Sequence, residues 1–364
     1  FPCTTLSLAG LEVPSYMQGR AFLGPDPGER RRFVYGCRDR VDEMFEMARS
    51  VRSARYLYIR NYHPYLSYNQ PSVFPDLGAI RREITRVAAE NLEALTPDQR
   101  DYAGPAKPVE AFYDCEADPG NLRNLIGTGM NAQQLIELNE HRAAFAARRM
   151  ALLDSGPIPE SEMWKWIRNE GKPLRDILEG KTNHQPDLAR AWAAADLVGT
   201  DRVEEMLELL KSGDPNQRYW AIIGLRQAGF DEKEKVIDHL DDVAPAVRIE
   251  TAGWLARDEN YREAALTRLV AELGHRDWWT ALRACRAIEL LGQDGRAALP
   301  AMRKLYDATR NEKGDGPFYL AFSSGAFLEQ FGEPTKPWDF APGAGAFTPE
   351  PEKKQDRDRA RIGK

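Results

Sequence analysis

The stretch Arg49–Asn61, RSVRSARYLYIRN, decides the fold of the first third of the chain. Aromatic and β-branched residues fill Arg55–Arg60, and this composition predicts a strand. Tyr56 and Tyr58 stand two residues apart, so in a strand both point to one face and are expected to pack there. The short segment 52–54 can turn a hairpin into a preceding strand. The stretch therefore predicts two antiparallel strands of one sheet.

Other segments complete this sheet. The strand before the hairpin turn is expected over Glu46–Val51, the apolar run Phe33–Cys37 precedes it, and Val109–Cys115 follows the hairpin. A helix is expected near residues 78–94, between the third and fourth strands. These elements predict an α+β fold for this part, a small antiparallel sheet with helices.

From about residue 130 onward the composition predicts helices alone. Asn131–Ser155 is expected to be one long helix, and Phe318–Phe331 the last one. Between them, turns at Asp214, Ala244 and Arg276 each precede an Ala-rich apolar segment, with a spacing of about 30 residues. This period is typical of an α-solenoid of HEAT-like helix pairs, whose neighbours hide each other's apolar faces.

The patterns divide the chain into four parts. Residues 1–126 hold the sheet, 127–182 form a helical connector, 183–333 form the repeat domain, and 334–364 form a Pro/Gly-rich and charged tail that is expected to be disordered. Four tryptophans lie at equivalent or neighbouring places in the repeats. They are expected to pack in the core, with a protein-binding groove as the alternative: Trp220, Trp254, Trp278 and Trp279.

Composition excludes several classes of protein. The net charge of −6 argues against a nucleic-acid binder. No run of about 18 apolar residues could cross a membrane. Phe1-Pro2-Cys3 is followed by no signal-peptide pattern, and we interpret it as a cut within a longer protein.

The cysteines and histidines predict no metal site. The four cysteines are far apart and form no CxxC pair, and the histidines show no HxxxH spacing. A disulfide between Cys37 and Cys115 is one interpretation, and buried free thiols are the favoured one.

Three segments resemble the C-terminal subdomain of the sulfatase family, in particular bacterial proteins similar to heparan N-sulfatases and arylsulfatases. The first combines Thr5–Pro14 with Met17–Arg20, the second is the hairpin quoted above, and the third is Glu110–Gly120, EAFYDCEADPG. The third segment is the most specific, because it is similar to a motif near the end of most sulfatases. The chain departs from that motif at Phe112, Cys115 and Leu122, and none of these changes touches chemistry.

The resemblance implies that the catalytic half of a sulfatase is missing here. The family uses a Cys or Ser in a C/S-x-P-x-R motif, converted to formylglycine, and the sequence contains no such motif. The calcium ligands of the family would also lie upstream of Phe1. We therefore expect no catalytic residue, no metal ligand and no cofactor in this chain, with formylglycine and calcium supplied by the missing N-terminal sulfatase domain. The resemblance also implies export of the parent protein to the periplasm or the outside.

A basic loop is the best candidate for substrate contact. Residues 29–60 contain nine arginines against five carboxylates. If the segment after Cys37 is extended, Arg38, Arg40 and Asp42 share one face, and arginine can grip a sulfate group with two hydrogen bonds. The resemblance places this loop near the mouth of the active site. His63 is a further candidate, as a proton donor or sugar contact. The alternative is that these charges pair in a structural network and that His63 is satisfied locally.

Two functions follow. The first is the C-terminal part of a sulfuric ester hydrolase acting on a sulfated glycan, inactive by itself. The second is a non-catalytic HEAT-repeat scaffold for a protein partner, with a relic sulfatase segment. Under the first, residues 1–126 should expose apolar surface that the missing half would cover.

Overall fold

The computed structural model describes residues 1–25, 27–180 and 184–336, and these residues form two compact units. Unit 1 comprises Phe1–Gly36, Ser50–Ile59 and Ala111–Phe145, and unit 2 comprises Cys37–Arg49, Arg60–Glu110 and the chain from Ala146 onward. The predicted tail lies outside the described residues, apart from 334–336. The four-part division of the sequence stays a prediction.

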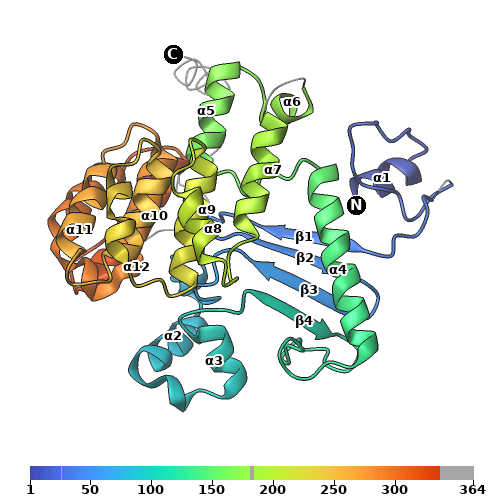
Figure 1. Ribbon diagram of the computed structural model, residues 1–364, viewed down its shortest axis with the longest axis horizontal. Coiled ribbons are helices and arrows are strands. Elements are labelled where there is room, and N and C mark those ends of the chain that lie inside the picture. Colours follow the sequence, from blue (N-terminus) through green and yellow to red (C-terminus); the bar gives the residue numbers. More distant parts are fainter. Residues whose placement is uncertain (26, 181–183, 337–364) are drawn as a thin grey trace. The chain divides into compact units, whose positions relative to one another are not determined.

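The four predicted strands are present and form one antiparallel sheet in the order β1-β2-β3-β4 (Figure 1). Their bounds are Val34–Arg38 for β1, Ala48–Arg52 for β2, Tyr56–Asn61 for β3 and Glu110–Asp114 for β4. Backbone hydrogen bonds fix the register of β2 and β3. Ser53 N donates to Tyr56 O at the hairpin turn, and Tyr62 N donates to Met47 O at the other end. The prediction of a single sheet is confirmed, and the β2 boundary was wrong by one or two residues.

Unit 1 buries one face of the sheet under a helix. Tyr56 and Phe112 stack with ring centroids 5.1 Å apart, and both rings pack against His141 of α4, which spans Ala132–Ala151. Tyr58 is also buried, so the predicted packing of Tyr56 and Tyr58 is confirmed. Figure 1 shows α4 running across the strands.

The N-terminal segment of unit 1 is thinly packed. Helix α1 spans Pro2–Leu8 and ends before Gly10, whose φ of 71° suits a chain reversal that favours glycine. Large apolar side chains of this unit are exposed, including Phe1, Leu8, Leu11, Phe22, Leu23 and Val34. The expected exposed apolar surface is therefore present in the described part of residues 1–126.

Unit 2 carries most of the helices. The first four are α2 (Ala79–Asn91), α3 (Pro97–Ala103), α5 (Glu160–Glu170) and α6 (Leu174–Glu179). Those after them are α7 (His184–Ala195), α8 (Val203–Leu209), α9 (Pro215–Gln227), α10 (Pro245–Leu255), α11 (Arg262–Glu272), α12 (Trp278–Leu291), α13 (Leu299–Thr309) and α14 (Asp315–Gln330). No described helix is long and apolar enough to cross a membrane.

Side-chain caps start two of the three helices that follow the turns indicated by the sequence, and α10 begins without one. The Asp214 side chain accepts a hydrogen bond from Asn216 N ahead of α9, and the Asp277 side chain accepts one from Thr280 N ahead of α12. Helices α9, α10, α11 and α12 each contact the next one along the chain, and they lie side by side in Figure 1. Whether they are HEAT-like repeats stays a prediction.

Two smaller expectations fail in part. The four cysteines are free, but Cys37 is exposed and Cys115 half-buried, so only Cys3 and Cys285 are the buried thiols that were expected. Among the four tryptophans, Trp220 and Trp254 are buried, whereas Trp278 is 48% exposed. Trp278 and Trp279 are the first two residues of α12, where few neighbours can cover both.

Candidate substrate-binding site

The loop after β1 turns sharply instead of staying extended. β1 ends at Arg38, and a tight turn follows in which Val41 and Met44 exchange backbone hydrogen bonds. Asp42 sits in this turn with a φ of 52°, in the left-handed region. The extended geometry that would put Arg38, Arg40 and Asp42 on one face is therefore wrong, because the strand alternation ends before the turn.

The structure separates the four predicted site residues. Arg40 and His63 line the same cavity, and Arg38 and Asp42 do not. Arg38 is exposed at the end of its strand. Asp42 is hydrogen-bonded to Tyr319, whose pKa is raised to about 12 by burial and then by this carboxylate. Substrate contact by any of the four stays a prediction.

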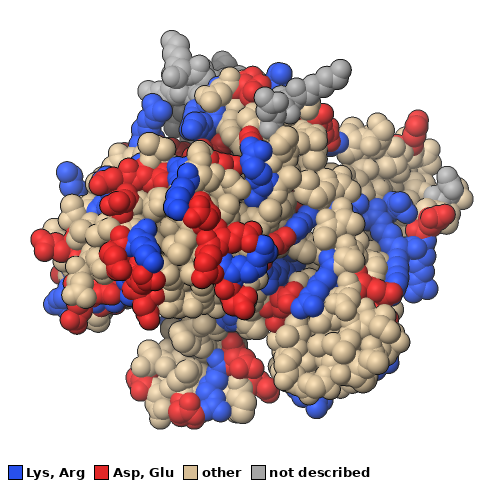
Figure 2. Space-filling view, viewed as in Figure 1, with Lys and Arg blue, Asp and Glu red and all other residues tan. Residues whose placement is uncertain are grey.

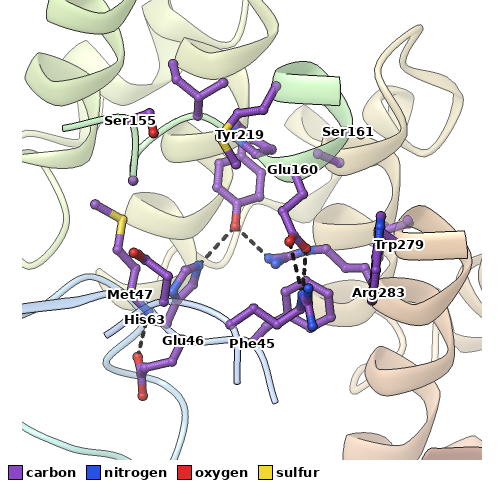
Figure 3. A pocket seen from close by; sticks show the side chains of 18 of the residues that line it. Phe45, Glu46, Met47, His63, Ser155, Glu160, Ser161, Tyr219, Trp279 and Arg283 are labelled. Atoms are coloured by element: carbon purple, nitrogen blue, oxygen red, sulfur yellow. Dashed lines mark hydrogen bonds and ion pairs between the residues drawn. The ribbon is translucent and has the colours of Figure 1, made fainter. Parts of the chain in front are cut away.

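The cavity that Arg40 and His63 line is the aromatic cavity of unit 2, with a volume of about 220 Å³. Three parts of the chain form its wall, namely the segments Asp39–Arg40 and Phe45–Met47, the segment from Asp154 to Met163 around the start of α5, and residues of α9, α10 and α12. The helices contribute Tyr219, Trp220, Ala246, Ile249, Trp279, Thr280 and Arg283. Figure 3 shows these groups converging from different elements.

Arg40 is held firmly on one side of the aromatic cavity. Its Nε lies 3.0 Å from both carboxylate oxygens of Glu160, and its Nη1 donates to the backbone carbonyl of Asp42 over 2.7 Å. The guanidinium also lies over the Trp279 ring, 4.2 Å from its centroid. Burial raises the pKa of Glu160, although Arg40 opposes this shift. These contacts match the structural alternative for Arg40, because its charge is already paired.

A chain of hydrogen bonds crosses the other side. The Tyr219 hydroxyl lies 3.0 Å from His63 Nε2 and accepts a bond of 2.6 Å from Arg283 Nη2, as Figure 3 shows. Arg283 also donates to Glu250 over 2.8 Å. Burial alone would raise the pKa of Glu250, but Arg283 and Arg226 hold it below its usual range. The chain therefore ends on a carboxylate that stays ionised.

His63 is a neutral imidazole in this setting. Its side chain is only 4% exposed, and burial followed by the Arg283 charge lowers its pKa to about 3. An imidazole with so low a pKa is neutral at neutral pH, so the imidazolium form that would act as a general acid is absent. His63 therefore fits a hydrogen-bonding contact and not the proton donor that the sequence left open.

Two polar atoms on the wall of the aromatic cavity have no described partner. His63 Nδ1 and Ser161 Oγ are both buried, and no described residue bonds to either. Buried polar groups normally bond to protein, water or ligand, because leaving one unpaired costs about 1–3 kcal/mol. Both atoms could bond to hydroxyl groups of a bound sugar.

Charge balance favours a neutral ligand group in this cavity. Four carboxylates line it, from Asp39, Glu46, Asp154 and Glu160, against the guanidinium groups of Arg40 and Arg283. Lys107 and Arg49 behind the wall pair with three of these carboxylates. The lining therefore offers no excess positive charge to attract a sulfate group.

The buried arginine behind this wall fixes the loop. Arg49 is 4% exposed, and its guanidinium donates to Asp39 over 2.9 Å and to Asp154 over 2.7 Å. This pair of bonds joins the loop after β1 to the segment before α5. Nearby, the Trp220 indole donates to Pro157 O over 2.7 Å. Both contacts hold the wall in one arrangement.

Sequence reasoning missed most of the groups that make this cavity. Glu160, Tyr219 and Arg283 lie 97 to 220 residues away from His63 and were not singled out. Besides Arg40 and His63, the sequence pointed to Trp220 and Trp279 through the repeat spacing, and both were expected in the core. One local signal was available in the sequence: Asp277 caps α12, the helix that carries both Trp279 and Arg283.

Within residues 1–25, 27–180 and 184–336, no group of three or more His, Cys, Asp and Glu side chains is arranged to hold a metal ion. The described residues therefore offer no fit for the calcium that the family resemblance implies.

Comparison with known proteins ties part of the chain to sulfatases. No family model matches the chain. Over 163 residues, or 45% of its length, the chain is 33% identical to an ulvan-active sulfatase of Formosa agariphila. The matched residues make up 26% of that relative, so the chain spans about a quarter of the length of the protein it matches. The similarity to sulfatases expected from the sequence motifs is thereby confirmed.

Proposed function

We propose that the chain is the C-terminal portion of a sulfatase that hydrolyses sulfate esters of a sulfated polysaccharide such as ulvan. The similarity to the ulvan-active sulfatase carries this proposal. In it, the rest of the protein supplies the formylglycine nucleophile and calcium, and this chain completes the fold and binds part of the substrate. Export to the periplasm or the outside belongs to the same proposal, because the enzyme would encounter a polymeric glycan there.

The aromatic cavity supports a role in holding a sugar ring. Trp279 can pack against the apolar face of a sugar ring with the side of its indole that Arg40 does not cover, and the carboxylate of Glu160 can accept hydrogen bonds from the sugar hydroxyls. His63 Nδ1 and Ser161 Oγ are the polar atoms without described partners. The substrate therefore meets preformed groups whose positions are fixed by Arg40, Tyr219 and Arg283.

The exposed apolar side chains of unit 1 support the proposal that another domain covers this surface. Phe1, Phe22 and Leu23 are each more than half exposed. Apolar groups gathered in one thinly packed segment are typical of a surface that another domain covers. The catalytic portion of a sulfatase is the partner that the proposal assigns to this surface.

A chimera tests the proposal. The segment of the ulvan-active sulfatase that matches this chain is replaced by the chain, and sulfate release from ulvan is measured by ion chromatography. We expect the chimera to release sulfate, and the relative truncated at the same point to release none. A folded chimera that binds calcium but releases no sulfate would contradict the proposal.

The chain alone provides the matching negative result. The purified chain should not hydrolyse 4-nitrophenyl sulfate, because the nucleophile is assigned to the rest of the protein. Hydrolysis above a boiled control would show that the active centre lies in this chain and that the assignment is wrong.

A scaffold that binds a protein partner is the second candidate. The observation that favours it is the row of helices α9–α12 in unit 2, whose neighbours contact one another as in a solenoid. Trp278, 48% exposed at the start of α12, would lie on a partner surface. A chimera without activity, together with a longer reading frame that lacks C/S-x-P-x-R, would favour this reading over the first.

A further inference from the structure

Unit 1 contains an open groove of about 760 Å³ whose lining includes five arginines, and we call it the arginine groove. Its charged lining consists of Arg30, Arg31, Arg32, Arg52, Arg55 and Glu137. The first three precede β1, the next two flank the β2–β3 turn, and Glu137 comes from α4. Figure 2 shows blue side chains gathered in the region where the N-terminal segment leads into β1.

The charge of the arginine groove is opposite to that of the whole chain. Five arginines against one carboxylate give the lining a formal charge of +4, whereas the chain carries −6. The aromatic cavity has two arginines against four carboxylates. A ligand with several negative charges is therefore attracted to the arginine groove and not to the aromatic cavity.

Three of these arginines form no ion pair with a described carboxylate. Arg30 bonds to no described residue, Arg31 donates only to the backbone carbonyl of Gln18 over 3.0 Å, and Arg52 donates only to the Cys115 thiol over 3.3 Å. Arg30 and Arg52 are also exposed. Each of the three guanidiniums can turn toward an anion without breaking an ion pair.

The other two arginines serve the structure. Arg32 pairs with Glu137 and Glu140 of α4, and Arg55 binds Asp114 with a shortest distance of 2.6 Å. These pairs join the segment before β1 to α4, and the β2–β3 turn to the end of β4. They hold the wall of the groove in place and leave the three unpaired arginines to meet a ligand.

We propose that the arginine groove binds a stretch of sulfated polysaccharide through Arg30, Arg31 and Arg52. Guanidinium groups bind sulfate through paired hydrogen bonds, and a groove open along its length accepts a polymer that extends beyond it. The groove is then a second contact for the polymer, separate in its residues from the aromatic cavity. The choice of a sulfated glycan rests on the proposed function.

Binding to dextran sulfate tests the inference on the whole chain. The variant Arg30→Gln, Arg31→Gln, Arg52→Gln is compared with the control Arg123→Gln, Arg168→Gln, Arg276→Gln. The control positions are exposed, lie outside the groove, and remove the same charge. At 150 mM NaCl we expect the groove variant to bind about ten- to a hundredfold more weakly, and the control to bind as the parent does.

The salt dependence gives a second readout that a folding defect would not reproduce. Release of counterions from a linear polyanion lowers log K by about 0.7–0.9 per contact for each decade of salt, so losing three contacts should flatten the slope by about 2. Neutral dextran should not bind. Circular dichroism and thermal unfolding check that both variants keep the fold of the parent.

Several outcomes would overturn the inference. These are an equal loss in the two variants, an unchanged salt slope, or binding of a DNA duplex as tight as that of dextran sulfate. The chimera separates this inference from the proposed function. Sulfate release by the chimera with no loss of binding in the groove variant removes only the inference, and the reverse result removes only the proposed function.

Discussion

Acid should destabilise unit 2 through the buried imidazole of His63. The folded state lowers the pKa of His63 from 6.5 to about 3, so between these values the unfolded chain binds a proton that the folded chain does not. Stability then falls as the pH falls from 6.5 toward 3. Between pH 7.5 and pH 5.0 the two pKa values correspond to a loss of about 2 kcal/mol in the free energy of unfolding.

Another buried group acts in the opposite direction, so wild-type data alone cannot isolate this effect. Burial raises the pKa of Glu289 to about 7, although Arg286 opposes the shift, and an acid of this kind loses stability as the pH rises from 4.5 through 7. The comparison must therefore be between variants at each pH. His63→Gln removes the titrating group and keeps an amide that can bond to Tyr219.

The assay is urea unfolding followed by tryptophan fluorescence at pH 7.5 and 5.0. All eight tryptophans lie after residue 145, so the signal reports on unit 2. On acidification, wild type should lose about 2 kcal/mol more than His63→Gln. Equal losses in wild type and His63→Gln would refute the claim that His63 is buried as a neutral group.

Three further substitutions test packing, each by the urea midpoint. Arg49→Gln should cost about 3–5 kcal/mol, because it leaves two carboxylates without their buried partner, and a cost below about 1 kcal/mol would show that the pairs are not buried. Trp220→Ala should cost about 3–5 kcal/mol through the cavity that it leaves. Gly171→Ala should cost about 1 kcal/mol, because Gly171 has a positive φ but open space around it. Gly199→Ala should cost clearly more, because its φ is similarly positive and its new Cβ would lie 2.6 Å from a methyl group of Val109. Equal costs for the two glycines would contradict the close approach.

The sheet could be predicted from the sequence because its signals are local. Tyr56 and Tyr58 alternate with half-buried residues, and the segment 52–54 is short enough for a hairpin, so strand and turn follow from a dozen residues. The predicted start of β2 at Glu46 was wrong. Glu46 and Met47 lie between apolar residues, but they line the aromatic cavity and do not join the strand.

The aromatic cavity could not be predicted, since its parts come together only through tertiary packing. Arg40 meets Glu160 across 120 residues, and His63 meets Tyr219 across 156. The turn at Asp42 has no strong local signal, because aspartate adopts positive φ only occasionally. Strand alternation was therefore extended past the point where the strand ends.

β1 is an edge strand, and all five of its residues are exposed. Free backbone groups along such an edge invite a strand from another molecule, which leads to aggregation. The three arginines at positions 30–32 stand just before the strand and Arg38 ends it, so two copies approaching edge to edge would bring like charges together. High salt screens that repulsion, and we therefore expect concentrated solutions of the chain to stay clear at low ionic strength and to become turbid as salt is added.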